Sequence, residues 1–375
     1  MQYFLSILVC FLLISLTRPA KAAFEQELIL DNGLKVIMAP QPANPLLTVR
    51  LVVKTGSGGE GDRADFGLAH LIEHMAFKST AGGRAEGQIA WEVESAGGTI
   101  SAYTWLDETV YHLTLPAEDV EKAFDILRDM VFFPAYEPNE FAREKEVVIE
   151  EIKKYADMPG DLLANNLYEM IFDRHAYAHP VIGFEETIRE VGLDRIRAFL
   201  DRHYRSDNIF IVVSGGFNPV ELKRSAAEYF GTLTKQDRVW PSPPKYPPSN
   251  ANQGPELKSA VSGKTDLVLI EIGFRAYAGQ NPDSVPSELL ASVLSQTEVS
   301  RLDEKVKSEL ALVTSISCYS SSFREAGLFS IYLETEIDQV TEAVSAIFDE
   351  LERLPHDPPD LDELQRVRAL STVYY

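Results

Sequence analysis

Two histidines and a glutamate lie close together in the segment GLAHLIEHMAFKST, which runs from Gly67 to Thr80. His70 and His74 are four residues apart, and Glu73 lies between them. If the segment is a helix, side chains four apart share one face, so both imidazoles point toward the same place. Neutral imidazoles at this spacing can both bind a zinc ion, while the glutamate faces a water molecule without binding the metal. The pattern therefore predicts a metal site.

The same spacing has a structural interpretation, in which both histidines pack on the buried face of an amphipathic helix. A second pair, His175 and His179 in HAYAH, is also four apart. It has no acid between its members, and the following Pro180 favours a loop. We expect no metal at this second pair. The interpretation of the first pair depends on finding a third ligand elsewhere in the chain.

The third ligand of a catalytic zinc comes from another element. The best candidate segment is EKEVVIEEIKKY, in which Glu144 and Glu151 are seven apart and share a helical face. Val147 and Val148 beside them predict a partly buried helix, and the alternative is a charged face exposed to solvent. Glu150 is a competing candidate because it is adjacent to Glu151.

The elements that must position these residues follow from the hydrophobic periodicity. ELILDNGLKVIMAP predicts a hairpin around its Asp-Asn-Gly turn, and LLTVRLVVKTGSG predicts a further strand. GGTISAYTWLDETVYHLTLP alternates as strands do, and AEDVEKAFDILRDMVFF has helical spacing. PNEFAREKEVVIEEIKKYAD predicts a helix that begins at Pro138 and stops near Pro159.

The second half of the chain repeats the order of elements in the first half. FSIYLETEIDQVTEAVSAIFDELERL parallels YHLTLPAEDVEKAFDILRDMVFF, and PPDLDELQRVRALSTVYY parallels EPNEFAREKEVVIEEIKKY. The chain is thus predicted to contain two copies of one α+β unit, of which the second lacks a counterpart of residues 157–233. The predicted domains are a signal peptide at 1–22, an N-terminal lobe at 23–239, a proline-rich linker at 240–255 and a C-terminal lobe at 256–375.

The net charge and the N-terminal sequence limit which classes of partner and which cellular locations are expected for the protein. The 375 residues carry a formal net charge of −22, which argues against a nucleic-acid partner because phosphate binding needs a basic face. The apolar run from Phe4 to Leu16 has the length of a signal peptide and is too short for a comfortable membrane span. Ala20 and Ala22 give a small-x-small cleavage pattern, so we expect cleavage after Ala22 and no stable membrane span afterwards. The predicted location is periplasmic or secreted, with an uncleaved N-terminal anchor as the alternative.

Cysteine usage agrees with a chain that has no disulfide. Cys10 leaves with the signal peptide, so Cys318 is the one cysteine expected in the mature sequence. It follows a strand-like stretch, and we expect it to be a buried, small apolar residue.

HLIEH together with Glu151, 77 residues after His74, resembles the zinc-peptidase family of pitrilysin, insulin-degrading enzyme and mitochondrial processing peptidase, whose motif is the inverzincin HxxEH. The stretches GSGGEGDRADFGLAHLIEHMAFKST, GGTISAYTWLDETVYHLTLP, HPVIGF and SRLDEKVKSELALVTSIS agree with it. The resemblance runs from about Leu28 to the end. With the repeat, it predicts an α+β fold of two homologous lobes, each a mostly antiparallel sheet with helices packed on one side, the second lobe being incomplete.

The resemblance implies a role for each residue of the site. The three implied zinc ligands are His70, His74 and Glu151. Glu73 is implied to be the general base, and Glu144 a second acid that is hydrogen-bonded to a ligand. Glu151 is preferred over Glu150 because the family pairs its two acids seven residues apart.

By the same resemblance, substrate binds as an added strand on a sheet edge near the metal. The segment GGTISAYT matches that edge, and its implied substrate-binding residues are Ser101, Ala102 and Tyr103. The family usually has asparagine where this chain has Ser101. The second lobe has no HxxEH, so no zinc is expected there. Arg368 and Tyr375 have the spacing of an arginine and a tyrosine that face the zinc in relatives, where the tyrosine stabilises the oxyanion. A surface charge is the alternative for Arg368.

The sequence thus predicts an exported zinc metalloendopeptidase, with Zn2+ as cofactor, that hydrolyses peptides or unfolded polypeptides with Glu73 as general base. Small members of the family work as dimers, so the resemblance implies a homodimer or a heterodimer with a related subunit. The alternative is a non-catalytic scaffold or peptide-binding subunit of a heterodimer, against which the intact HxxEH and Glu151 argue. Zinc storage or transport would require histidine-rich tracts, which the sequence lacks.

Overall fold

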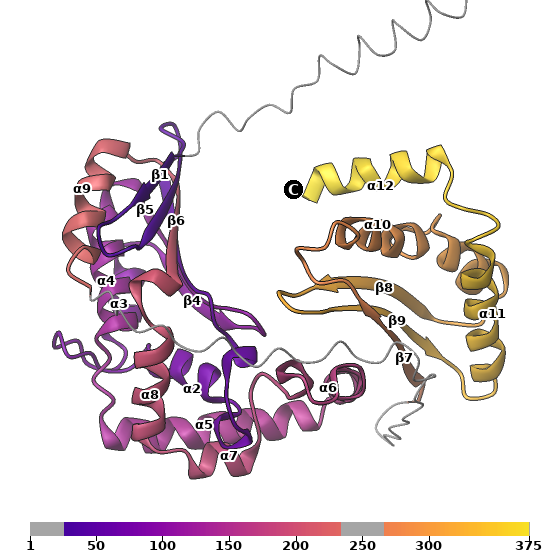
Figure 1. Cartoon of the computed structure of the whole chain (residues 1–375), viewed down its shortest axis with the longest axis horizontal. Coiled ribbons are helices and arrows are strands. Elements are labelled where there is room, and N and C mark those ends of the chain that lie inside the picture. Colours follow the sequence, from indigo (N-terminus) through magenta and orange to yellow (C-terminus); the bar gives the residue numbers. More distant parts are fainter. Residues whose placement is uncertain (1–25, 234–265, 375) are drawn as a thin grey trace, which may run out of the picture.

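A computed structural model describes residues 26–233 and 266–374 (Figure 1). The predicted signal peptide at 1–22 and the proline-rich linker at 240–255 lie outside the described residues, so the domain boundaries stay predictions. Within the described ranges, no helix has the length and apolar character needed to cross a membrane.

The N-terminal lobe is built on a six-stranded sheet with the order β1-β2-β6-β3-β5-β4. All neighbouring strands are antiparallel except β2 and β6, which are parallel. The strand β6 is the last strand of this lobe in sequence and lies between β2 and β3, while β4 forms one edge. The strands are β1 Gln26–Ile29, β2 Lys35–Pro40, β3 Leu46–Val53, β4 Thr99–Thr104, β5 Thr109–Pro116 and β6 Ile209–Gly215.

The predicted hairpin at the start of the lobe is present. Strands β1 and β2 pair antiparallel, with Ile29 opposite Lys35. Gly33 in the turn between them has a φ of 86°, which glycine adopts without steric cost. The Asn32 side chain accepts a hydrogen bond from the backbone N–H of Leu34 at 3.2 Å, which stabilises the turn.

Helices cover one face of this sheet, because the strand side chains alternate between apolar and polar. Leu47, Val49 and Leu51 of β3 are fully buried under the helices, whereas Thr48 and Arg50 lie on the other face. The covering helices are α3 Gln88–Ser95, α4 Val120–Phe132 and α9 Pro219–Phe230 (Figure 1). The mostly antiparallel sheet with helices on one side is therefore confirmed for this lobe.

A second group of helices packs around an apolar cluster of its own, separate from the cluster under the sheet. This group consists of α2 Leu68–Met75, α5 Pro138–Ala156, α7 Glu185–Glu190 and α8 Leu193–His203. The helix α5 begins at Pro138 and ends before Pro159, as predicted. The next helix, α6 Pro159–Phe172, was not predicted, because Pro159 both prevents α5 from continuing and occupies the first turn of α6.

The C-terminal lobe has a three-stranded antiparallel sheet in the order β7-β9-β8. Its strands are β7 Val268–Ala276, β8 Ser315–Ser322 and β9 Gly327–Thr335. The helices α10 Ser284–Leu294 and α11 Val340–Arg353 pack on one face of it, and α12 Leu361–Tyr374 packs on α10 (Figure 1). Cys318 of β8 is 6% exposed in this core, as predicted. The two-lobed α+β fold is confirmed.

The lobes meet where α6 and the turn after β8 come together. Leu167 of α6 packs directly on Gly273 of β7, where a β-carbon would lie 2.4 Å from the leucine Cδ1. Phe323, in the turn between β8 and β9, packs with Phe172 and Tyr177 of the N-terminal lobe. The helix α6 therefore forms the bridge between the two sheets (Figure 1).

Candidate metal centre

The backbone amides at the start of α2, the helix that carries HLIEH, are hydrogen-bonded to the buried carboxylate of Glu60. Gly67 precedes α2 with a φ of 89°, and a β-carbon there would lie 2.5 Å from the Ile182 carbonyl oxygen, so only glycine fits. Glu60 accepts hydrogen bonds from the backbone N–H groups of Gly67 at 3.0 Å and Ala69 at 2.8 Å. These are amides that a helix start leaves without partners. Burial raises the pKa of Glu60 well above its usual value, although the amide hydrogen bonds oppose this.

The structure brings His70, His74 and Glu151 together. One ligand atom from each lies within 4.8 Å of the others, and His74 Nε2 is 3.5 Å from Glu151 Oε2. The two histidines come from α2 and the glutamate from α5, which packs against it. Glu150 instead points to solvent and pairs with Lys153 at 2.8 Å. The geometry therefore selects Glu151 over Glu150.

The side chains along α5 face in different directions. Glu144 is 6% exposed and Val148 is fully buried, on the face that also carries Glu151. Val147 is 51% exposed, so only one of the two valines contributes to burial of the helix. The prediction of a partly buried α5 is correct, but Val147 does not support it.

The orientation of His74 is fixed by Glu144, as the resemblance implied. His74 Nδ1 donates to Glu144 Oε1 at 2.8 Å, which leaves Nε2 directed toward Glu151. Glu144 Oε2 also forms an ion pair with Lys78 at 2.6 Å. Burial alone would lower the pKa of His74, but the hydrogen bond to Glu144 and the surrounding carboxylates raise it. The pKa of Glu144 is lowered because His74 and Lys78 outweigh the effect of burial.

His70 is held in the form that a metal ligand needs. Burial, and secondarily the neighbouring His74, lower the pKa of His70 to about 3, so its imidazole is neutral. Two imidazoles and one carboxylate form a donor set that catalytic zinc sites use. The residues present therefore fit a zinc ion.

Glu73 lies beside His70, His74 and Glu151 and is not part of that group. It is 8% exposed, and its Oε2 accepts a hydrogen bond from Thr104 Oγ1 at 2.7 Å. Burial raises the pKa of Glu73, and the charge of Glu151 acts in the same direction, while Thr104 and His74 oppose it. A buried carboxylate with a raised pKa next to a metal site is suited to exchange protons with water.

The predicted substrate residues lie on the edge strand next to α2. Ser101, Ala102 and Tyr103 belong to β4, which pairs with β5 on one side only. Ser101 is exposed and Tyr103 is 41% exposed. An extended peptide therefore has access to the backbone groups of β4 along that edge.

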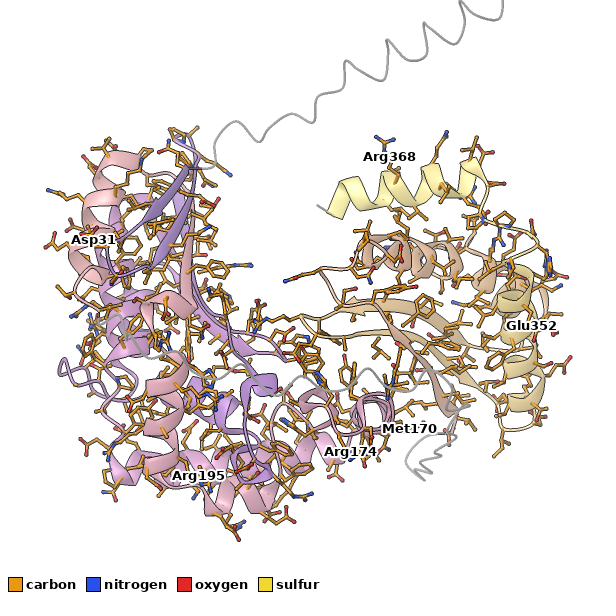
Figure 2. The ribbon with its side chains drawn as sticks, viewed as in Figure 1. Asp31, Met170, Arg174, Arg195, Glu352 and Arg368 are labelled. Carbon is orange, nitrogen blue, oxygen red and sulfur yellow. The ribbon has the colours of Figure 1, made fainter. Side chains whose placement is uncertain are left out.

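Arg368 of the second lobe is not brought to this cluster. Arg368 is an exposed residue of α12 and lies at the end of the C-terminal lobe opposite α6, away from α2 and α5 (Figures 1 and 2). Tyr375 lies outside the described residues. The functions of both stay predictions.

The two histidines of HAYAH make separate contacts. His175 pairs with Glu325 of the other lobe at 3.3 Å, and the His179 ring stacks on Phe66 with centroids 3.7 Å apart. In the described part of the chain, the group on α2 and α5 is the one cluster of histidines, cysteines and acids that could hold a metal. Sequence reasoning did not identify Thr104, Lys78 or Glu60, because their contacts arise only when distant segments pack together.

Two models of one peptidase family match adjacent parts of the chain. The model of the insulinase family, peptidase family M16, matches residues 35–185, and the M16 inactive-domain model matches residues 190–371. The chain belongs to peptidase family M16. The metal cluster lies within the residues that match the insulinase model. Most of the C-terminal lobe lies within the residues that match the inactive-domain model.

Relatives of this M16 protein are named as zinc proteases. It is 29% identical to an uncharacterised zinc protease of Rickettsia bellii, over 91% of this chain and 80% of that protein. It is 27% identical to the uncharacterised zinc protease YmxG of Bacillus subtilis, over 89% and 80% of the two chains. It is 26% identical to the mitochondrial-processing peptidase subunit beta of Lentinula edodes, over 84% and 68%.

Solved structures share the fold of this M16 protein. A protease from Helicobacter pylori superposes with a TM-score of 0.84 at 22% identity, over 93% of this chain and 84% of that chain. The peptidase M16 inactive domain from Pseudomonas fluorescens gives a TM-score of 0.80 at 21% identity, over 92% and 83%. At these identities the similarity establishes the two-lobed fold and nothing further.

Proposed function

We propose that this M16 protein is a zinc-dependent endopeptidase that hydrolyses peptides or unfolded polypeptides. The observation that supports the proposal most is the meeting of His70, His74 and Glu151 within 4.8 Å, with Glu73 buried beside them. The relatives named as zinc proteases support it as well.

In this proposal each side chain of the centre has one task. His70, His74 and Glu151 hold the zinc, and Glu144 keeps His74 in the orientation that binding requires. Zinc, when bound, lowers the pKa of water toward about 7 and polarises the scissile carbonyl. Glu73 accepts a proton from the attacking water and delivers it to the leaving amine.

The substrate in this proposal extends the N-terminal sheet. A peptide in extended conformation pairs with the free edge of β4 through the backbone of Ser101, Ala102 and Tyr103. Because α2 packs against β4, a carbonyl of the added strand passes beside Glu73 and the ligands. Recognition through the backbone accommodates many sequences, which suits an enzyme that cuts unfolded chains.

The test compares a Glu73→Gln variant with the unmodified protein in cleavage of a quenched fluorescent peptide. We expect kcat to fall by about 10²- to 10⁴-fold, because the general base is lost, while the zinc content stays the same. Glu150→Gln is the matched control, since Glu150 is adjacent to a ligand yet exposed and directed away from it. Equal rates for Glu73→Gln and the unmodified protein would refute the mechanism. Zinc binding without turnover in the unmodified protein would favour the alternative, a non-catalytic peptide-binding subunit.

We also propose that the protein is exported and acts as a dimer with itself or with a related subunit. The apolar run from Phe4 to Leu16 and the small residues Ala20 and Ala22 support export. One similar protein is named as a subunit of a processing peptidase, which supports a dimer. A mature N-terminus at Ala23 in the secreted or periplasmic fraction is the expected result, and light scattering of that fraction gives the oligomeric state. An intact Met1 in a membrane pellet would indicate an anchor instead.

A further inference from the structure

Thr104, the last residue of β4, contacts the proposed general base directly. Its side chain is 9% exposed, and Oγ1 donates a hydrogen bond to Glu73 Oε2 at 2.7 Å. Among residues 26–233 and 266–374, the Thr104 hydroxyl is the one hydrogen-bond donor found for this carboxylate. The second oxygen, Oε1, is left available.

The residue type at position 104 is explained by this contact and not by packing. Ile100, Ala102 and Thr104 share the inward face of β4, and the first two pack against the apolar core of the lobe. A hydroxyl on that face loses its hydrogen bonds to water on folding, which is unfavourable unless it gains a partner in the protein. The Glu73 carboxylate is that partner.

Thr104 is itself held in place by its neighbours. It lies opposite Thr109 in the β4–β5 register, and the Thr109 hydroxyl donates to the Thr55 carbonyl at 3.0 Å. The next residue, Trp105, accepts a hydrogen bond from the backbone N–H of Ser57 at 3.0 Å and donates one to the Glu108 carbonyl at 2.8 Å. The hydroxyl of Thr104 therefore projects from a fixed point of the sheet.

We propose that Thr104 is a positioning residue that fixes the Glu73 carboxylate relative to the β4 edge. This inference rests on the proposed peptidase function. With Oε2 held by Thr104, Oε1 is the oxygen that accepts the proton of the attacking water. Because Thr104 is part of the strand that the substrate extends, the base and the substrate backbone are placed by the same element. A peptide paired with β4 is thereby aligned with the base as soon as it binds.

The test removes the hydroxyl of Thr104 with little change of shape and then restores it. In Thr104→Val we expect kcat to fall by about 10- to 100-fold, because the base is displaced, while KM changes less than about twofold since the β4 backbone is intact. Thr104→Ser keeps the hydroxyl and is expected to retain kcat within about threefold. Thr48→Val is the matched control: it removes a hydroxyl that is hydrogen-bonded to Thr114 at 2.9 Å in the same sheet, and we expect an unchanged kcat.

Three outcomes would overturn the inference: an unchanged kcat in Thr104→Val, an equal loss in Thr104→Ser, or a loss confined to KM. Glu73→Gln in the same assay separates this inference from the function itself. If Glu73→Gln abolishes turnover and Thr104→Val does not, only the positioning role is wrong.

Crystal structures of the variants decide the question even if the unmodified protein shows no turnover. We expect the Glu73 carboxylate to move in Thr104→Val and to stay in place in Thr104→Ser, with the same zinc content in both. An unmoved carboxylate in Thr104→Val would refute the positioning role. If Thr104→Val does not fold, Thr104→Ala removes the same hydroxyl with a smaller side chain and is read in the same way.

Discussion

His74 is held in the metal cluster through a series of side-chain contacts. Its Nδ1 is bound by Glu144, whose other oxygen is bound by Lys78, and Lys78 pairs in turn with Glu86 at 3.0 Å. Such outer partners fix the orientation of a ligand ring and increase its basicity. A series of contacts therefore runs from Glu86 at the protein surface to His74 in the metal cluster.

Glu144→Gln is expected to weaken zinc binding by about 10- to 100-fold, because the amide holds the His74 ring less firmly than the carboxylate does. Competition with a chromophoric chelator at fixed pH measures the affinity. Glu146→Gln on the same helix is the control, since Glu146 is exposed and pairs with Arg189. An affinity equal to that of the unmodified protein would show that Glu144 does not orient the ligand.

The sequence predicted those residues of the centre whose positions follow from helical periodicity. His70, His74 and Glu73 lie within one short helix, and the spacing of seven placed Glu144 and Glu151 on one helical face. The resemblance to the zinc-peptidase family then implied Glu151 as the third ligand. Thr104 carries no such signal, since its contact with Glu73 depends on how an edge strand packs against a helix 31 residues away. A threonine in a strand is common enough that its type alone indicates nothing.

At the scale of elements, Arg301 binds the first turn of α12, the helix that packs on α10 of the C-terminal lobe. Arg301 donates to both oxygens of Glu363 at 2.7 and 2.8 Å and to the Asp357 carbonyl at 2.8 Å. The two side chains are 13% and 14% exposed, so solvent screens the pair only partly. The hydrogen bonds from Arg301 lower the pKa of Glu363 from 4.5 to about 2.

Glu363→Gln is therefore expected to lower the free energy of unfolding by on the order of 2 kcal/mol at pH 7. Since the pKa of Glu363 is lower in the folded protein, its contribution is present above pH 4.5 and is lost as the pH falls toward 2. Urea unfolding at several pH values measures the difference between variant and unmodified protein. Glu352→Gln, at an exposed position of α11, is the control (Figure 2). A difference that stays constant from pH 7 to pH 3 would contradict the role of the pair.

The elements around the metal cluster were largely predictable, whereas α3 and the helices from α6 to α10 were not predicted. Alternation and helical spacing located the β1–β2 hairpin, the β4–β5 pair and α5. At Pro159 the sequence signal for the end of one helix is also the signal for the start of the next. The periodicity could not distinguish a loop from α6, although α6 forms the bridge between the lobes.

At the scale of the whole molecule, the two lobes are joined by polar contacts around Asp107 in the β4–β5 turn. Asp107 Oδ1 accepts from the Tyr177 hydroxyl at 2.5 Å, and Oδ2 accepts from the backbone N–H of Arg324 at 2.7 Å. The Arg324 guanidinium also donates to the carbonyls of Asp107 and Lys54 at 3.0 and 3.1 Å. The turn of the second lobe is thus bound beside the strand that carries Thr104.

Asp107→Ala is expected to uncouple the lobes, because it leaves the Tyr177 hydroxyl and the Arg324 amide without their acceptor, at a cost of about 1–3 kcal/mol. Scanning calorimetry should then show two separated transitions, the lower one from the C-terminal lobe. Glu118→Ala removes an exposed acid of the N-terminal lobe and serves as the control. A thermogram identical to that of the unmodified protein would mean that the apolar contacts alone join the lobes.

The place of β6 between β2 and β3 has a consequence for synthesis on the ribosome. All residues of the metal centre precede β6 in the chain, yet β2 and β3 are joined only through β6. Until residues 209–215 emerge, the nascent sheet exists as two separate pieces with unpaired edges, which are the edges most prone to wrong pairing. A fragment that ended at residue 185, where the insulinase match ends, would keep His70, His74 and Glu151 and still lack the strand that joins the two parts of the sheet.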